Sequence, residues 1–295
     1  MSRIDSYLLS RKEKINRALK RLFAKPKHPE IIYQAMSYSV MAGGKRLRPI
    51  LTLATVESLG TPDDEVLSLA CAVELIHTYS LIHDDLPAMD DSDLRRGKPT
   101  CHRAFGEAIA VLAGDALLTM AFQLVAEYGV NSGNWRGALE ICHSLSRAAG
   151  VEGMIGGQVL DLLAEGKNIS LAELDQIYCR KTGALIEAAV ICGAMAANSS
   201  LEQIQALTGY ASRLGLAFQI VDDLLDREGS VEKMGKLPNS DEVHCKSTYP
   251  ALLGLDPTRR KAGELYREAL SCLAPLGETG ALLRQLAGYL VFRDK

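Results

Sequence analysis

The sequence predicts an all-α protein, a single-domain helical bundle around a central cavity. Period-two patterns of aromatic and β-branched residues, which are typical of strands, are hard to find along the 295 residues. Segments rich in alanine and leucine with helical periodicity run through the whole chain. Glycine and proline clusters separate these segments, with no linker and no internal repeat. We therefore expect one bundle over residues 1–295, with its site built from side chains on facing helices.

Several of the expected helices have chemically explicit starts. Thr61-Pro62-Asp63-Asp64 combines an N-cap residue, a proline and two acids of a first helical turn. Ser170 with Glu173, and Ser200 with Gln203, have the spacing of capping boxes. With the hydrophobic periodicity, these signals predict helices at 3–23, 29–41, 46–59, 63–86, 107–128, 134–150, 152–164, 171–197, 201–228, 257–274 and 279–292.

The bulk composition excludes several classes of protein. The net charge is −3 and the basic residues form no long run, so we expect no nucleic-acid partner. The seven cysteines are widely spaced without a CxxC pair, and no charged-then-apolar leader is visible, which predicts a reduced, cytoplasmic protein. We expect no membrane span, because the most apolar stretch, 184–197, is short and is interrupted by Glu187.

An acidic cluster followed by basic residues ends the helix expected over 63–86. Five aspartates fall within ten positions, and Arg95 and Arg96 follow at once. Mg²⁺ takes one or two carboxylates plus substrate phosphate oxygens, and arginine pairs bidentately with phosphate. The cluster therefore predicts a site for a diphosphate with Mg²⁺.

The spacing of the first aspartates requires a break in the helix. Asp84 and Asp90 are six positions apart, so in an unbroken helix they point about 120° apart. Pro87 lacks a backbone N–H and crowds the preceding turn. We therefore expect distorted backbone over 86–90, which lets Asp84 and Asp90 act together.

A second acidic cluster, Asp222-Asp223-Leu224-Leu225-Asp226, ends the helix expected over 201–228. Asp222 and Asp226 are one turn apart on one face, and Gln219 follows on that face toward the N-terminus. Acids at the C-terminal end of a helix oppose its dipole, so they need a compensating cation. We expect this cluster to face the first one across a cavity.

Cations beside a glycine turn predict an anion pocket. Gly43-Gly44-Lys45-Arg46-Leu47-Arg48-Pro49 opens a helix, and free N–H groups at a helix start favour anions. The pattern is weak alone and gains weight because His77 and Arg96 supply further donors. Lys181-Thr182 lies inside an otherwise apolar helix. A lysine that faces the surface next to a threonine that faces the core explains this pair as well as a functional role does. The long irregular stretch with Lys236 is consistent with a lid over a charged site or with a mobile loop.

In these motifs and their order, the sequence resembles the trans-isoprenyl diphosphate synthases, most closely the bacterial type of farnesyl diphosphate synthase. The resemblance covers essentially the whole chain. It rests on Gly44-Lys45-Arg46-Leu47-Arg48-Pro49, residues 77–90, Arg95-Arg96-Gly97-Lys98-Pro99-Thr100, Gly156-Gly157-Gln158, Lys181-Thr182, residues 218–226 and Lys246-Ser247-Thr248-Tyr249-Pro250.

The resemblance implies an all-α prenyltransferase that condenses isopentenyl diphosphate with dimethylallyl or geranyl diphosphate, giving farnesyl diphosphate and diphosphate. It implies three Mg²⁺ ions per active site and a homodimer, with apolar helices around 107–128 as the candidate dimer face. The implied metal ligands are Asp84, Asp85, Asp90, Asp222, Asp223 and Asp226. The implied ligands of isopentenyl diphosphate are Gly44, Lys45, Arg48, His77 and Arg96. Those of the allylic diphosphate are Arg95, Lys181, Lys236 and Lys246, and the implied catalytic residues are Lys181, Thr182 and Gln219.

The resemblance also bears on product length and on the lid. Tyr79 and Ser80 occupy the cavity floor in such families, and an aromatic residue five positions before Asp84 resembles enzymes that make the C15 product. Asn239 and Cys245 stand where the family usually has glycine. Since glycine tolerates positive φ best, we expect a lid that closes differently and a slower turnover.

Three alternatives stay open. A geranyl or geranylgeranyl diphosphate synthase differs only in product length. A terpene cyclase usually pairs its aspartate motif with an Asn/Ser/Glu metal triad, and it gives no role to Lys45, Arg48 and Arg96. A non-catalytic prenyltransferase subunit usually loses an aspartate motif, whereas this chain keeps both.

Overall fold

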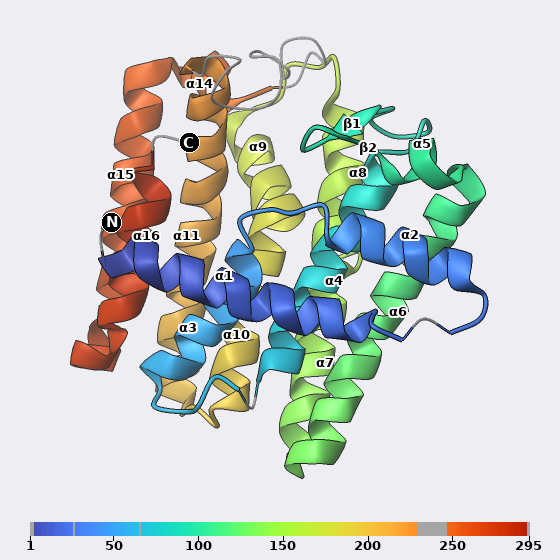
Figure 1. Ribbon diagram of the computed structural model, residues 1–295. Coiled ribbons are helices and arrows are strands. Elements are labelled where there is room, and N and C mark those ends of the chain that lie inside the picture. The colour runs from blue at the N-terminus through green and yellow to red at the C-terminus, as the bar shows by residue number, and fades with distance from the viewer. Residues whose placement is uncertain (1–2, 26, 65, 229–246, 294–295) are drawn as a thin grey trace.

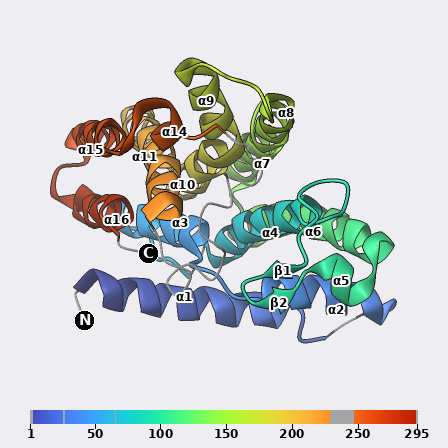
Figure 2. The same ribbon diagram turned by 90° about the horizontal axis from the view of Figure 1, so that it is seen from above.

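The computed structural model is an all-α bundle, as the sequence predicts, and it describes residues 3–25, 27–64, 66–228 and 247–293 (Figures 1 and 2). Its α-helices are α1 (Arg3–Leu22), α2 (Glu30–Val40), α3 (Leu47–Ser58), α4 (Leu67–Asp84), α5 (Cys101–Phe105), α6 (Glu107–Ser132), α7 (Trp135–Ala149), α8 (Met154–Ala164), α9 (Leu171–Tyr178), α10 (Ala184–Ala196), α11 (Leu201–Glu228), α14 (Tyr249–Leu253), α15 (Leu255–Cys272) and α16 (Ala281–Val291). A π-helical turn (Cys179–Gly183) joins α9 to α10, a 3₁₀ segment (Ala274–Gly280) precedes α16, and β1 (Leu94–Arg95) pairs antiparallel with β2 (Lys98–Pro99).

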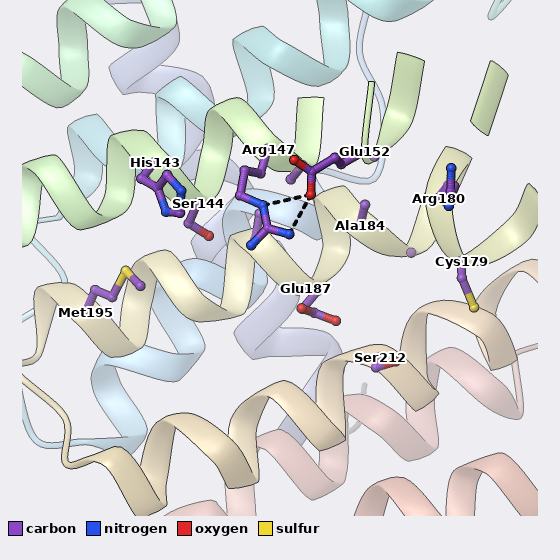
Figure 3. Close-up of a pocket in the computed structure, with 14 residues that line it drawn as sticks. His143, Ser144, Arg147, Glu152, Cys179, Arg180, Ala184, Glu187, Met195 and Ser212 are labelled. Atoms are coloured by element: carbon purple, nitrogen blue, oxygen red, sulfur yellow. Dashed lines mark hydrogen bonds and ion pairs between the residues drawn. The ribbon is translucent and has the colours of Figure 1, made fainter. Parts of the chain in front are cut away.

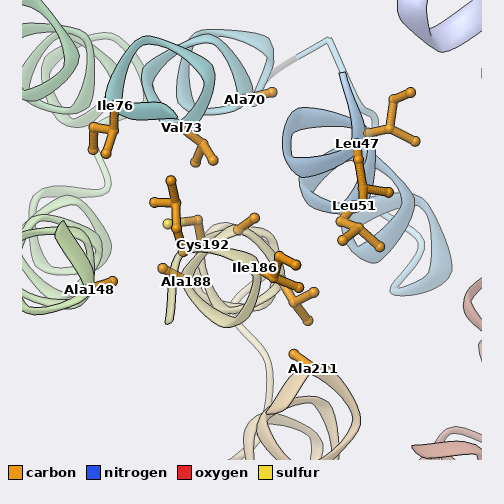
Figure 4. Close-up of a cluster of buried hydrophobic side chains, with 14 of the residues drawn as sticks. Leu47, Leu51, Ala70, Val73, Ile76, Ala148, Ile186, Ala188, Cys192 and Ala211 are labelled. Carbon is orange, nitrogen blue, oxygen red and sulfur yellow. The ribbon is translucent and has the colours of Figure 1, made fainter. Parts of the chain in front are cut away.

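Helix α10 forms the centre of the bundle. It packs against α3, α4, α7 and α11, and Figure 4 shows Leu51 of α3, Val73 of α4 and Ala211 of α11 on the sides that face it. Ile186 and Cys192 on α10 are fully buried, as is Val73 on α4. A helix that is apolar on nearly all sides is stable only when it is surrounded. The apolar stretch 184–197 of the sequence is thus a buried helix of the core.

The start of α4 differs from the prediction. The expected cap at Thr61 would begin the helix near residue 63, but α4 begins at Leu67. The acids of that segment pair with α1 instead, because Lys14 Nζ lies 2.7 Å from a carboxylate oxygen of Asp63 and 2.7 Å from one of Asp64. The capping box predicted at Ser170 and Glu173 is present at the start of α9.

Helix α6 is longer and more apolar than expected. In the part of the chain that the structure describes, it alone is long and apolar enough to cross a membrane, with a mean hydropathy of 1.9. The expectation of no membrane span overlooked this helix, which is longer than the stretch 184–197 and passes the test by its length and its composition. Core helices of globular proteins also meet this test, and α6 lies against α2, α4 and α7. Its exposed side includes apolar residues, with Val111 and Leu112 exposed to 41% and 53%, next to exposed acids such as Asp115.

Candidate active site

The π turn replaces the middle of the continuous helix that was predicted over 171–197. Two glycines of neighbouring helices allow close backbone contact with it. A Cβ atom at Gly157 of α8 would lie 2.2 Å from the backbone nitrogen of Lys181, and one at Gly215 of α11 would lie 2.9 Å from the Cα atom of Gly183. Backbone packing at this distance needs residues without a side chain. The periodicity of the segment 171–197 does not reveal these contacts, so the π turn could not be predicted from it. Such turns are frequent at functional sites.

The π turn lies between the two acidic motifs. The ammonium of Lys181 acts on Asp84 at the end of α4, and the Thr182 hydroxyl donates a hydrogen bond to Gln219 Oε1 of α11 at 2.9 Å. Gln219 precedes Asp222 by about one turn of α11. Figure 1 shows that α4 and α11 reach the same upper end of the bundle. The segments that carry both motifs are therefore joined through the π turn.

The first acidic motif begins where α4 ends. The helix stops at Asp84, and the backbone N–H of Asp90 donates to the carbonyl oxygen of Asp84 at 2.9 Å. The predicted break beside Pro87 is confirmed, since the chain doubles back there. Burial raises the pKa of Asp84 to about 6, Lys181 opposes this rise, and the charge of Asp90 adds to it. The carboxylates of Asp84 and Asp90 are thus close enough to interact.

The second aspartate of each motif is buried and bonded within the protein. Asp85 is 2% exposed and accepts hydrogen bonds from Nε and Nη2 of Arg95 at 2.7–3.0 Å. Asp223 is 4% exposed and accepts hydrogen bonds from the Tyr178 hydroxyl at 2.7 Å and the Tyr249 N–H at 3.1 Å.

Asp85 and Asp223 are predicted as metal ligands, and Arg95 is predicted to bind the allylic diphosphate. In this structure all three side chains are bonded within the protein. The physical reason is helical geometry, because adjacent helical residues point about 100° apart. When Asp84 and Asp222 face the site, the residues that follow them face neighbouring elements.

Asp222 has a cationic partner that sequence analysis did not identify. Arg293 Nη2 lies 2.5 Å from Asp222 Oδ1, and its guanidinium group stacks 4.2 Å from the centroid of the Phe218 ring. The Arg293 side chain is 4% exposed. The dipole argument requires a cation at this helix end, and Arg293 supplies it. Its identity was hidden because it lies 71 residues further along the chain.

The glycine turn before α3 directs one of its cations inward. Arg46 has a φ of +55° and is 3% exposed. Its guanidinium group donates to Glu74 at 2.5 Å, to Asn16 Oδ1 at 3.0 Å and to the carbonyl oxygen of Val40. Arg46 thus ties the turn to α1, α2 and α4, which leaves Lys45 and Arg48 for other contacts.

The remaining cations of the predicted anion pocket gather around His77. Burial, followed by the charges of Arg48 and Arg96, lowers the pKa of His77 well below its ordinary value. Burial likewise lowers the pKa of Arg48, whose Nε has no hydrogen-bond partner among the described residues. Gly44 has a φ of +125°, which favours glycine, and its lack of a side chain leaves room for the Arg96 guanidinium group. Lys45 lies on the side of the second aspartate motif, where the charges of Arg293 and Asp222 act on its ammonium. Arg48 and His77 are half-buried, whereas Lys45 and Arg96 are exposed. The group is therefore a partly open concentration of positive charge, which favours an anionic ligand.

Tyr79 lies in the interior, more than one turn before Asp84 on α4. It is 5% exposed, and its hydroxyl is buried without a partner among the described residues. Burial and the charge of Asp84 raise the pKa of Tyr79 to about 12. Its ring makes an edge contact with His83, at 5.8 Å between centroids, and Ser80 donates to the carbonyl oxygen of His77.

Some predicted residues lie outside the part of the chain that the structure describes. They are Lys236, Lys246, Asn239 and Cys245.

A separate groove of about 400 Å³ lies on another side of the π turn, between α7, α10 and α11 (Figure 3). Glu187 points into it, and Arg147 pairs with Glu152 at 2.6 Å along its edge. Cys179 and Arg180 of the π turn face this groove. None of the described metal or diphosphate residues predicted from the sequence lines it.

An all-α bundle with two aspartate motifs joined through one π turn, and with a group of arginines around His77, defines the class of helical transferases that act on diphosphates. The family model for polyprenyl synthetases matches residues 29–276, and the chain belongs to this family. It is a prenyltransferase.

Relatives in sequence and in structure extend over almost the whole chain. Farnesyl diphosphate synthase of Bacillus subtilis is 45% identical and each chain covers 99% of the other. That of Escherichia coli is 46% identical over 95% of each chain. A chloroplastic geranylgeranyl pyrophosphate synthase of Catharanthus roseus is 44% identical, over 98% of this chain and 81% of the relative. The crystal structure of an FPP/GFPP synthase from Zymomonas mobilis superposes with a TM-score of 0.87 at 36% identity and covers 98% of each chain.

Proposed function

We propose that the protein is a farnesyl diphosphate synthase, which joins isopentenyl diphosphate to dimethylallyl and then geranyl diphosphate. The observation that carries this proposal is the π turn, which connects the first aspartate motif through Lys181 with the second through Thr182 and Gln219. The anion pocket around His77 supplies the place for a second diphosphate. Relatives named as farnesyl diphosphate synthases in two bacteria support the same substrate pair.

Asp84, Asp90, Asp222 and Asp226 are the residues that would hold Mg²⁺. Their donors are all carboxylate oxygens, which suit this hard cation. No three metal-binding side chains among the described residues converge to enclose an ion by themselves. This donor set fits Mg²⁺ that arrives with diphosphate, because Mg²⁺ completes its coordination with phosphate oxygens and water. We propose three ions, which when bound neutralise the charge of the departing diphosphate.

Cationic side chains bind and orient the two substrates. Arg95 and Lys181 hold the allylic diphosphate, together with Lys236 and Lys246. The pocket of Gly44, Lys45, Arg48, His77 and Arg96 holds isopentenyl diphosphate. Fixed cations in a buried site stabilise the charge that develops as the allylic C1–O bond breaks.

Acceptor dipoles of the π turn and α11 face the allylic cation. The carbonyl oxygen of Thr182 and the amide of Gln219 stabilise it, and the Thr182 hydroxyl and Asp223 hold that amide in place. The C4–C1 bond then forms, and the proton leaves to the departing diphosphate because no side-chain base is evident. Exclusion of water protects the cation until the bond forms.

Tyr79 and Ser80 end the space in which the product grows, which favours the C15 product. A geranylgeranyl diphosphate synthase is the second candidate, because relatives with that name are 43–44% identical. A terpene cyclase or a non-catalytic subunit is disfavoured by the two complete aspartate motifs and by the anion pocket.

Incubation with isopentenyl and geranyl diphosphates, with and without Mg²⁺, tests this proposal. We expect diphosphate release only with Mg²⁺ and a C15 product on chromatography. A C20 product would transfer the proposal to geranylgeranyl synthesis. Absence of diphosphate release in the presence of Mg²⁺ would rule out both.

The proposed assembly is a cytoplasmic homodimer formed through the outer face of α6. Exposed Val111 and Leu112 support this face, since an apolar surface of a long helix favours a partner.

A further inference from the structure

Helix α8 contacts the π turn a second time through a carboxylate that the proposed mechanism does not use. Asp161 lies one turn after Gly157 on the same face of α8. Its Oδ2 accepts a hydrogen bond from Lys181 Nζ at 2.6 Å. The side chains of Lys181 and Asp161 are 28% and 17% exposed, so water screens this ion pair less than a surface pair.

We propose that Asp161 is a positioning residue that holds the Lys181 ammonium where the allylic diphosphate binds. This inference rests on the proposed function. A lysine ammonium ends a flexible four-carbon stem, so its position is poorly defined without a partner. The pair with Asp161 orders the ammonium before substrate arrives, which reduces the entropy lost on binding.

The Lys181 ammonium of this ion pair also acts on the first aspartate motif. The charge of Lys181 opposes the pKa rise that burial causes at Asp84, so the ammonium lies within electrostatic range of the first aspartate motif. Asp161 on α8 and Asp84 at the end of α4 therefore act on one ammonium from two elements. Gly157 allows the Lys181 backbone to lie close to α8, and Asp161 binds the ammonium at the end of the Lys181 side chain.

A purely structural role for Asp161 predicts a different kinetic pattern. Loss of support for α8 would lower stability and impair both substrates together. A positioning role predicts a selective rise in the KM for the allylic substrate. The KM for isopentenyl diphosphate stays nearly constant, because Lys45, Arg48 and His77 bind that substrate.

Steady-state kinetics of the full chain with Mg²⁺, geranyl diphosphate and isopentenyl diphosphate distinguish these patterns. We expect Asp161→Asn to raise the KM for geranyl diphosphate about tenfold and that for isopentenyl diphosphate less than about twofold. Asp161→Glu keeps the charge and is expected to restore most of the affinity. Glu152→Gln removes the Arg147–Glu152 pair on another side of the π turn and serves as the matched control, with both KM values unchanged.

A double-mutant cycle tests whether Asp161 acts through Lys181. Adding Asp161→Asn to Lys181→Met is expected to cause no further change. A further loss in the double variant, or an equal rise of both KM values in Asp161→Asn, overturns the proposal. If Asp161→Asn does not fold, Asp161→Glu decides, since a longer carboxylate stem is expected to raise only the KM for geranyl diphosphate, about threefold.

Calorimetry with Mg²⁺ and inorganic pyrophosphate separates this proposal from the proposed function. Suppose the wild-type protein makes no product but binds pyrophosphate about ten times more tightly than Asp161→Asn. In that case the proposed function is wrong, but Asp161 still positions Lys181 for binding of pyrophosphate. Equal pyrophosphate binding by both proteins overturns the positioning role.

Discussion

Arginine side chains dominate the electrostatics of this site, and each has a different task. Arg46 is buried against Glu74 and holds the glycine turn, whereas Arg48 beside it has a buried Nε without a partner among the described residues. Arg95 is bound to Asp85, and Arg293 to Asp222. Residue type alone does not show which of these arginines has an acidic partner, because those partners lie on other elements of the fold.

His77 provides a test of this environment through the pH dependence of stability. Burial and nearby arginines lower the pKa of His77 well below its ordinary value of 6.5. Below about pH 6.5 the unfolded chain therefore binds a proton that the folded protein does not, so stability falls as the pH falls. Between about pH 7.5 and 5.5, we expect the wild-type protein to lose about 1.4 kcal/mol more than His77→Gln.

Urea denaturation of the ligand-free protein at each pH measures this difference. His143→Gln is the matched control, because His143 is exposed and is expected to leave the wild-type pH dependence unchanged. Equal pH dependence in the wild-type protein and His77→Gln would mean that the folded protein protonates His77 as readily as the unfolded chain does.

At the scale of elements, the π turn depends on close packing between helices. Its backbone touches α8 at Gly157 and α11 at Gly215, and its side chains reach Asp161 and Gln219. The positions of Lys181 and Thr182 therefore depend directly on how α8 and α11 pack against the turn. A regular helix through this segment would rotate these two side chains relative to their partners.

Substitution of Gly157 tests this packing. A Cβ atom there would lie 2.2 Å from Lys181 N, so Gly157→Ala must displace backbone. We expect a loss of about 1–3 kcal/mol of unfolding free energy and a loss of prenyltransferase activity.

Gly263→Ala is the matched control, because Gly263 lies in α15 with no atom within 4 Å of the added Cβ atom. It is expected to stabilise the protein by about 0.5–1 kcal/mol. Urea denaturation measures both changes. A neutral or stabilising Gly157→Ala would contradict the close contact between α8 and the π turn.

At the scale of the whole molecule, one core unites the helices, with α10 at its centre. Buried apolar residues from α1 through α16 form a continuous cluster. Outside this cluster, α6 exposes more large apolar side chains than the charged α15, among them Val111, Leu112 and Val130. The proposed dimer face is therefore placed on α6.

Light scattering after gel filtration tests the proposed homodimer. We expect the wild-type protein to elute with twice the chain mass of 32.0 kDa. Leu112→Glu places a charge on the proposed interface and is expected to give a monomer, because burying an unpaired charge is costly. Leu201→Glu is the control, since Leu201 is 71% exposed on α11 and is expected to keep the dimer. A wild-type monomer, or a dimer that Leu112→Glu leaves intact, would contradict this face.

Local chemistry made several features predictable. The break beside Pro87, the capping box at Ser170 and the burial of α10 follow from residues close together in sequence. The predicted helix start at Thr61 was wrong, because Asp63 and Asp64 bind Lys14 of α1. A contact with α1, which is distant in sequence, thus overrode the local capping signal.

The sequence by itself determined the all-α class and the order of acids, cations and glycines, since helix propensity and spacing act over a few residues. Only the tertiary structure decided how these residues are oriented. It turned Asp85 and Asp223 toward protein donors, brought Arg293 to Asp222, and wound 179–183 into a π turn that links Lys181 with Asp161. These outcomes depend on contacts between segments far apart in the chain, and periodicity within one segment carries no information about them.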